Sequence, residues 1–234
     1  MVFAVAWATD PATACWDELV RAHVHDGAVD YAALRGAARP ALDGCVGRFA
    51  EVRSMAGWTE PQRLAWWINA YNAYTVLLVV EHPGIASIKD IGWPLSTPWK
   101  QAFIHLEGLA GRVLTLDDVE HDVIRKAFAE PRVHMALVCA SRSCPPLRAE
   151  AYAPDRLDAQ LGDQARRFLA DPSRNRVDAA GLHRSKIFAW YEADFAGAGG
   201  VREFLATWGP PPMQAAAGSA PIDHLPYDWS LNGR

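Results

Sequence analysis

The sequence is poor in the residues that would assign it to several functional classes. Only 4 of its 234 residues are cysteines, which is too few for the dense disulfide framework of a small secreted module. No run of about 18 apolar residues occurs outside one segment that contains Asn and Tyr, so we expect no transmembrane helix. The net charge is −4 and no basic patch dominates, so we expect no nucleic-acid partner.

Several signature motifs are also missing. There is no Gly-rich phosphate loop, no G-x-S-x-G nucleophile elbow and no H-E-x-x-H zinc helix. Cys139 and Cys144 form a C-x₄-C pair, but no second pair of metal ligands accompanies it, as a structural zinc site would require. The sequence therefore predicts neither a metal nor a cofactor.

Length and composition predict a single domain over residues 1–234, because half of the chain is apolar and can build one sizeable core. The start, "MVFAVAWATD", is apolar but short and lacks a basic flank, so residues 1–12 are interpreted as disordered or as the remnant of an export signal. Both a cytoplasmic and an exported location stay open. Residues 209–221, "GPPPMQAAAGSAP", are low in complexity and predict a surface loop.

A long helix is predicted in "TEPQRLAWWINAYNAYTVLLVVEHPG". Thr59 is suited to cap its start, and Pro83-Gly84 ends it. Nearly every position between them is apolar, which is typical of a buried central helix. Asn69 and Asn72 share one face of it, and buried amides must be hydrogen bonded. They either hold a neighbouring loop or line a site.

Strands are fewer and shorter. Residues 133–139 are predicted as a buried strand, residues 103–116 as a hairpin, and a second, short hairpin is predicted around Ala180-Gly181. We therefore predict a mainly helical α+β fold, in which the buried helix packs on a small antiparallel sheet. The combination of an Asn-bearing helix with His and Cys suggests a papain- or transglutaminase-like architecture.

The stretch "VCASRSCPPLR" carries the most chemistry. Cys139 ends the predicted strand, where loops often build sites, and Ser141 and Arg142 follow it. A thiolate nucleophile needs a base, which His121 could supply with Glu120 orienting its ring. Strand alternation would turn His134 away from Cys139, so His134 is interpreted as a core histidine. An inert buried thiol and a Cys139–Cys144 disulfide remain alternatives.

Lys186, at the start of "KIFAWYEADF", is a second candidate contact for substrate. Its ammonium group could bind an anionic group of a ligand or could simply lie at the start of a helix.

Several of these stretches together resemble the family called domain of unknown function 547. In chain order these stretches are "HVHDGAVDYAALR", "LAWWINAYNAYTVLLVVEHPGIASIKDI", "LTLDDVEHDVIR", "PRVHMALVCASRSCPPLRAEAY", "LHRSKIFAWYEADF" and "YDWSLN". The chain departs from the family pattern at Arg142, where a small or aliphatic residue is common. The resemblance implies membership but no reaction.

Two functions follow as hypotheses. The first is a cysteine-dependent hydrolase or acyl/thiol transferase acting on a small molecule or peptide, with Cys139 as nucleophile, His121 as base and Glu120 orienting it. Asn69, Asn72, Ser141, Arg142 and Lys186 would contact substrate or stabilise charge. The second is a non-enzymatic ligand- or protein-binding domain in which the Cys139/Cys144 pair is structural. The sequence does not determine the substrate or the oligomeric state.

Overall fold

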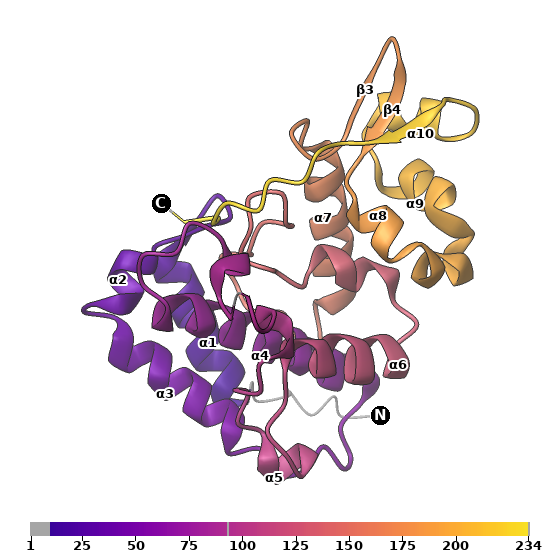
Figure 1. The fold of residues 1–234 in the computed structure, drawn as a ribbon. Coiled ribbons are helices and arrows are strands. Elements are labelled where there is room, and N and C mark those ends of the chain that lie inside the picture. The colour runs from indigo at the N-terminus through magenta and orange to yellow at the C-terminus, as the bar shows by residue number, and fades with distance from the viewer. Residues whose placement is uncertain (1–9, 93, 234) are drawn as a thin grey trace.

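The computed structural model describes residues 10–92 and 94–233. The N-terminal half is helical (Figure 1), with α1 (Pro11–His23), α2 (Tyr31–Arg35) and α3 (Arg39–Ala50) packed on the long helix α4 (Glu60–Glu81). A two-stranded ribbon, β1 (Val24–His25) and β2 (Ala28–Val29), joins α1 to α2. The prediction for residues 1–12 falls mostly outside the described residues. Pro11 and the buried Ala12 belong to α1, which Asp10 caps.

Helix α4 forms as the sequence predicts. Thr59 and Gln62 make a capping box, in which each side chain bonds the backbone N–H of the other residue. Every residue from Leu64 to Val80 is buried. A helix that is apolar on all sides can be stable only when other elements surround it. Accordingly, α4 packs against α1, α2, α3 and the π-helical segment η3 (Asp118–Ile124).

A disulfide joins α1 to α3 through Cys15 and Cys45, while Cys139 and Cys144 are free thiols. The sequence analysis considered a bridge only between Cys139 and Cys144. The two bridged cysteines are 30 residues apart, and nothing in their spacing indicates a pair. They meet because both helices pack against the same central helix.

The C-terminal half builds a second hydrophobic core between helices and a small sheet. Its elements are α7 (Leu157–Ala170), β3 (Arg176–Asp178), β4 (Gly181–Arg184), α8 (Ile187–Trp190), η5 (Glu192–Ala198), α9 (Gly200–Trp208), α10 (Pro211–Ala217) and β5 (Ile222–His224). Strand β4 pairs antiparallel with β3 and parallel with β5. This sheet packs on α10 rather than on α4, so the central helix and the sheet lie in different parts of the molecule.

The mainly helical α+β class is confirmed, but three local predictions differ from the structure. Residues 209–221 include helix α10, and its side chains Met213 and Ala217 pack in the second core. Prolines are tolerated at the start of this helix because the N–H groups of a first helical turn have no partner within the helix. The hairpin predicted at 103–116 is reduced to one bridge, between Ile104 and Leu114, with the short helix α5 (Glu107–Ala110) between them.

The strand predicted at residues 133–139 is wrong. The chain forms a 3₁₀ helix, η4 (Pro131–Met135), and then an irregular segment. A short apolar run is compatible with either conformation, and periodicity alone cannot separate them. The remaining short elements of the central part are η1 (Ile88–Asp90), η2 (Pro98–Lys100) and α6 (Arg125–Ala127).

The C-terminal segment returns to the N-terminal helices. After β5 it crosses from the sheet towards α2 (Figure 1). Val29 N–H donates to the carbonyl of Asn232 (3.1 Å), and the Tyr31 hydroxyl donates to the Asn232 amide oxygen (2.8 Å). Segment 226–233 therefore ties the two halves of the chain together. No helix among the described residues combines the length and apolar character needed to cross a bilayer.

Candidate active site

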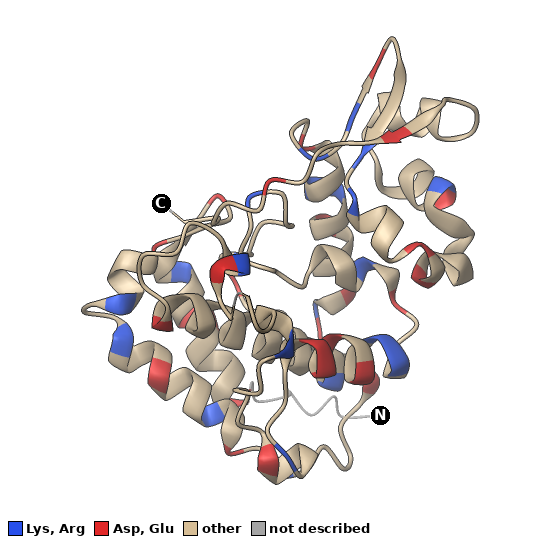
Figure 2. Ribbon diagram, viewed as in Figure 1, with Lys and Arg blue, Asp and Glu red and all other residues tan. Residues whose placement is uncertain are grey.

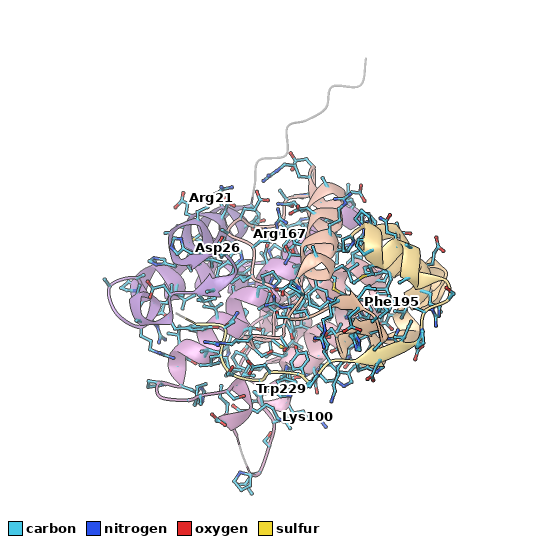
Figure 3. The ribbon with its side chains drawn as sticks, turned by 90° about the horizontal axis from the view of Figure 1, so that it is seen from above. Arg21, Asp26, Lys100, Arg167, Phe195 and Trp229 are labelled. Atoms are coloured by element: carbon cyan, nitrogen blue, oxygen red, sulfur yellow. A yellow bond between two sulfur atoms is a disulfide. The ribbon has the colours of Figure 1, made fainter. Side chains whose placement is uncertain are left out.

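A cavity of about 270 Å³ lies where the two halves of the chain and segment 226–233 meet. Trp229, on that segment, lies between the violet N-terminal helices and the orange and yellow C-terminal helices (Figure 3). The described residues that line the cavity are Tyr71, Trp99, Asp117, Glu120, His121, His134, Leu137, Cys139, Cys144, Ile187, Trp190, Tyr191, Tyr227 and Trp229. The cavity thus brings together Cys139, His121 and Glu120.

Cys139 is half-buried and its sulfur is surrounded by hydrogen-bonding groups. Its Sγ lies 3.2 Å from the Ser141 hydroxyl and 3.3 Å from the Tyr227 hydroxyl. Its backbone N–H donates to Cys144 Sγ (2.7 Å). Hydrogen bonding from Cys144, together with Ser141 and Tyr227, outweighs burial and lowers the pKa of Cys139 to about 7.

Cys144 has the opposite character. Burial raises the pKa of this thiol well above its ordinary value, and the neighbouring Cys139 raises it further. Cys144 therefore keeps its proton at neutral pH and can donate it to the Cys139 thiolate. Cys139 is therefore the thiol that ionises, and Cys144 is the thiol that donates a hydrogen bond.

The backbone between them is strained at Ala140. Its φ is +58°, a left-handed conformation that costs a residue with a Cβ roughly 1–2 kcal/mol. Segment 226–233 holds this conformation, because the Asn232 N–H donates to the Ala140 carbonyl (3.0 Å) and the Arg142 N–H donates to the Ser230 carbonyl (2.8 Å). Strain of this kind, fixed by a neighbouring segment, is frequent at functional sites.

His134 is buried and hydrogen bonded, as expected of a core histidine, but it also belongs to the cavity wall and does not point away from the site. The prediction that it points away assumed strand alternation, which does not apply to a 3₁₀ helix followed by an irregular segment. The His134 ring stacks on Tyr191 with 4.0 Å between centroids, and its Nε2 lies 2.7 Å from an Asp194 carboxylate oxygen. Arg125 binds the same carboxylate through two nitrogens, at 2.5 and 2.8 Å. Burial lowers the pKa of His134, so the ring is neutral at pH 7.

Glu120 and His121 come from η3, the π-helical segment of "TLDDVEHDVIR". π-helical turns are frequent at functional sites, because they shift side chains off the regular helical spacing. Glu120 is buried and accepts a hydrogen bond from the Tyr71 hydroxyl (3.0 Å). Its carboxyl also bonds Tyr191. Glu120 is thus held by two tyrosines, and no hydrogen bond between it and His121 is observed among the described contacts.

The contacts of the two histidines assign them different protonation patterns. His121 Nδ1 accepts from the Arg125 guanidinium (2.6 Å), which places the ring proton of a neutral His121 on Nε2. His134 donates from Nε2 to Asp194, which leaves Nδ1 as the nitrogen that can accept a proton. On this basis His121 Nε2–H is a hydrogen-bond donor, and His134, oriented by Asp194, is the better base.

The other predicted contact residues lie away from the cavity wall. Asn69 bonds both backbone groups of Tyr152, at 2.9 Å each, and Asn72 bonds the Ala136 carbonyl and the Val138 N–H, also at 2.9 Å each. Of the two alternatives for these amides, the contacts correspond to holding a neighbouring loop.

Ser141 reaches the Cys139 sulfur, while Arg142 lines a second cavity of about 350 Å³ on the other side of the 139–144 loop. Lys186 is exposed just before α8 and is not among the residues that line the first cavity.

The comparison with known families decides the membership. Residues 55–169 match a family described as "Protein of unknown function, DUF547". The chain belongs to the DUF547 family. The matched segment contains α4, η3 and the 139–144 loop, whereas Tyr191, Asp194 and Tyr227 lie beyond it. No curated protein and no solved structure matches the chain. The papain- or transglutaminase-like architecture therefore stays a prediction.

Sequence reasoning missed His134, Asp194 and Tyr227 as members of the site. The latter two stand in the stretches "KIFAWYEADF" and "YDWSLN", which the sequence analysis used only for Lys186 and for the family resemblance. Among residues 10–92 and 94–233, no group of three or more His, Cys, Asp or Glu side chains is arranged to hold a metal ion.

Proposed function

We propose that the cavity is the active site of a cysteine-dependent hydrolase or acyl transferase, with Cys139 as the nucleophile. The observation that carries this proposal is the pair of hydroxyls, Ser141 and Tyr227, within hydrogen-bond distance of one half-buried sulfur in a cavity lined by two histidines. A structural thiol needs no such stabilisation, whereas a thiolate nucleophile does.

The proposed reaction has two steps. The Cys139 thiolate attacks the acyl carbon of the substrate, a C–S bond forms, and the bond to the leaving group breaks. The Cys139 thiol gives its proton to His134 Nδ1 as the thiolate forms, and the leaving group takes this proton from the His134 imidazolium as it departs, while His121 Nε2–H donates a hydrogen bond to it. In the second step His134 Nδ1 removes a proton from water or from an acceptor nucleophile, which attacks the thioester and releases the thiolate.

The hydrogen bond of His134 to Asp194 supports the role of His134 as base. The carboxylate fixes the tautomer and stabilises the imidazolium that forms when the ring takes a proton. Glu120, which bonds Tyr71 and Tyr191, would position the Tyr191 ring under His134 rather than orient His121 directly.

Acyl-enzyme trapping tests the proposal. The protein is mixed with p-nitrophenyl acetate, and the intact mass and the nitrophenolate burst are followed. We expect one acetyl group on Cys139 and none on the Cys139→Ala variant. His134→Gln should still be acetylated but should turn over at least about ten-fold more slowly, since general-base catalysis typically contributes 10²–10⁴-fold. Acetylation of the Cys139→Ala variant at the native rate would overturn the proposal.

A non-enzymatic binding domain is the second candidate. It is favoured by the amides of Asn69 and Asn72, which are fully used in holding backbone, and by the Cys139 N–H, which bonds Cys144 as in a purely structural loop. Equal acetylation of Cys139 and of an exposed thiol in an unfolded control would favour it.

A further inference from the structure

Five aromatic rings form much of the cavity wall: Trp99, Trp190, Tyr191, Tyr227 and Trp229. Four of them contact one another, with centroid distances of 5.7 Å for Trp99–Trp229, 4.8 Å for Trp190–Tyr227, 5.7 Å for Trp190–Trp229 and 4.5 Å for Tyr227–Trp229. Trp190 is 47% exposed although it is a large apolar side chain. A continuous aromatic surface that opens to solvent is typical of a ligand-binding site.

The ionisable side chains of the cavity wall, apart from its tyrosines and cysteines, are two acidic residues and two histidines. None of the described residues that line the cavity is Lys or Arg, and two of them, Asp117 and Glu120, are acidic. The acidic residues lie on and next to η3, which Figure 2 shows beside the basic start of α6. His134 is neutral because burial lowers its pKa, and His121 accepts a hydrogen bond from Arg125, which excludes a proton on that nitrogen.

The neighbouring cations do not reverse this balance. Arg125 is paired with Asp194, and Lys89 and Lys100 are exposed, so water screens their charges. The same cations show that these rings accept positive charge. Lys89 Nζ lies 5.0 Å from the centroid of Trp229, and the Arg125 guanidinium lies 5.1 Å from that of Tyr191. Lys89 does not line the cavity, so it approaches Trp229 from outside and leaves the ring available within.

From these contacts we infer that the cavity binds a small organic cation, an alkylammonium group, against the rings of Trp190, Tyr227 and Trp229. The positive charge is balanced by Asp117 and Glu120, and a volume of about 270 Å³ limits the group to a small one. Tyr227 belongs to this wall and also bonds Cys139, so a bound cation lies next to the thiol. The assignment of this cation to the acyl substrate rests on the proposed function. The binding of the cation itself is independent of that function.

Choline and its uncharged isostere 3,3-dimethyl-1-butanol test the inference. Both are titrated into the full-length protein at constant ionic strength and followed by tryptophan fluorescence and calorimetry. We expect choline to bind at least roughly ten-fold more tightly, which corresponds to a cation–π contribution of about 1.4 kcal/mol. Trp190→Leu and Trp229→Leu should weaken choline binding, whereas Trp208→Leu, at a half-buried tryptophan on α9 outside the cavity, should not.

The outcomes separate the two proposals. Equal binding of choline and the isostere, or no binding of either, overturns the inference. Choline binding that persists in the Cys139→Ser variant supports the inference whether or not Cys139 is acylated in the native protein. If Cys139 is acylated by p-nitrophenyl acetate and choline neither binds nor slows this reaction, the inference fails and the proposed function stands.

Discussion

The pH dependence of Cys139 alkylation follows directly from the groups around its sulfur. With a pKa of about 7, half of the Cys139 thiols are ionised at pH 7. An ordinary cysteine with a pKa of about 8.5 is only about 3% ionised there, roughly 16-fold less. Because a thiolate of lower pKa is also a weaker nucleophile, by about five-fold over this difference, the net advantage in rate at pH 7 is only about three-fold. The midpoint of the pH profile is therefore more diagnostic than the rate.

Alkylation with iodoacetamide between pH 5 and pH 10, quantified by peptide mass spectrometry, measures that midpoint. The sign is that of an acid whose ionised form is stabilised: the rate should rise through pH 7 and level off above it. Cys144, whose pKa is raised by burial, should stay unmodified over the range in which Cys139 reacts. An unfolded sample in denaturant gives the reference midpoint of about 8.5.

A matched pair of variants tests the cause. Cys144→Ala removes the donor that contributes most to the low pKa and should move the Cys139 midpoint towards about 8.5, whereas Cys144→Ser keeps a donor and should stay nearer 7. Native Cys139 titrating at 8.5 or above would refute the reasoning, and so would identical midpoints for the two variants.

Three further predictions concern stability. Replacing Cys15 and Cys45 by Ala should lower the free energy of unfolding in denaturant by roughly 3–4 kcal/mol, the chain-entropy value for a 30-residue loop. A reductant should have no further effect on this double variant. An equal loss in a Cys139→Ala control would contradict the assignment of the loss to the disulfide. Asn72→Ala should lower the free energy of unfolding by about 2–4 kcal/mol, because it leaves the Val138 N–H and the Ala136 carbonyl without their partner. It should also make Cys139 alkylation less uniform. A loss of stability below about 1 kcal/mol would show that water replaces the amide. Tyr31→Phe should cost only about 1 kcal/mol, the value of one hydrogen bond, and a larger loss would mean that segment 226–233 detaches as a unit.

Helix α4 was predictable because its signals are local. Thr59, Pro61 and Pro83 mark its ends within a few residues, and its apolar run is too long for a strand. The segment after η4 was not predictable in this way. Its backbone groups bond the side chain of Asn72 instead of a neighbouring strand, and a sequence does not show which amide will act as the partner.

The residues of the site likewise differ in whether the sequence alone could identify them. Cys139, His121 and Glu120 stand in conspicuous motifs within the matched segment and were predicted to meet. His134 was set aside because the argument about its orientation depended on a strand that does not form. Asp194, on η5, could not be assigned from the sequence, since its partner, His134, is 60 residues away in the chain.

The return of residues 226–233 to the N-terminal helices has a consequence for the timing of biosynthesis. Tyr227 supplies a donor to the sulfur, and Asn232 supports the left-handed Ala140, yet both leave the ribosome long after Cys139 does. A nascent chain that has emerged only as far as β5 contains every residue of the matched family segment, and its Cys139 already has Cys144 and Ser141 beside it. It still lacks the Tyr227 hydroxyl at the sulfur and the Asn232 contact at Ala140, so the surroundings of Cys139 are complete only after residues 226–233 have been synthesised.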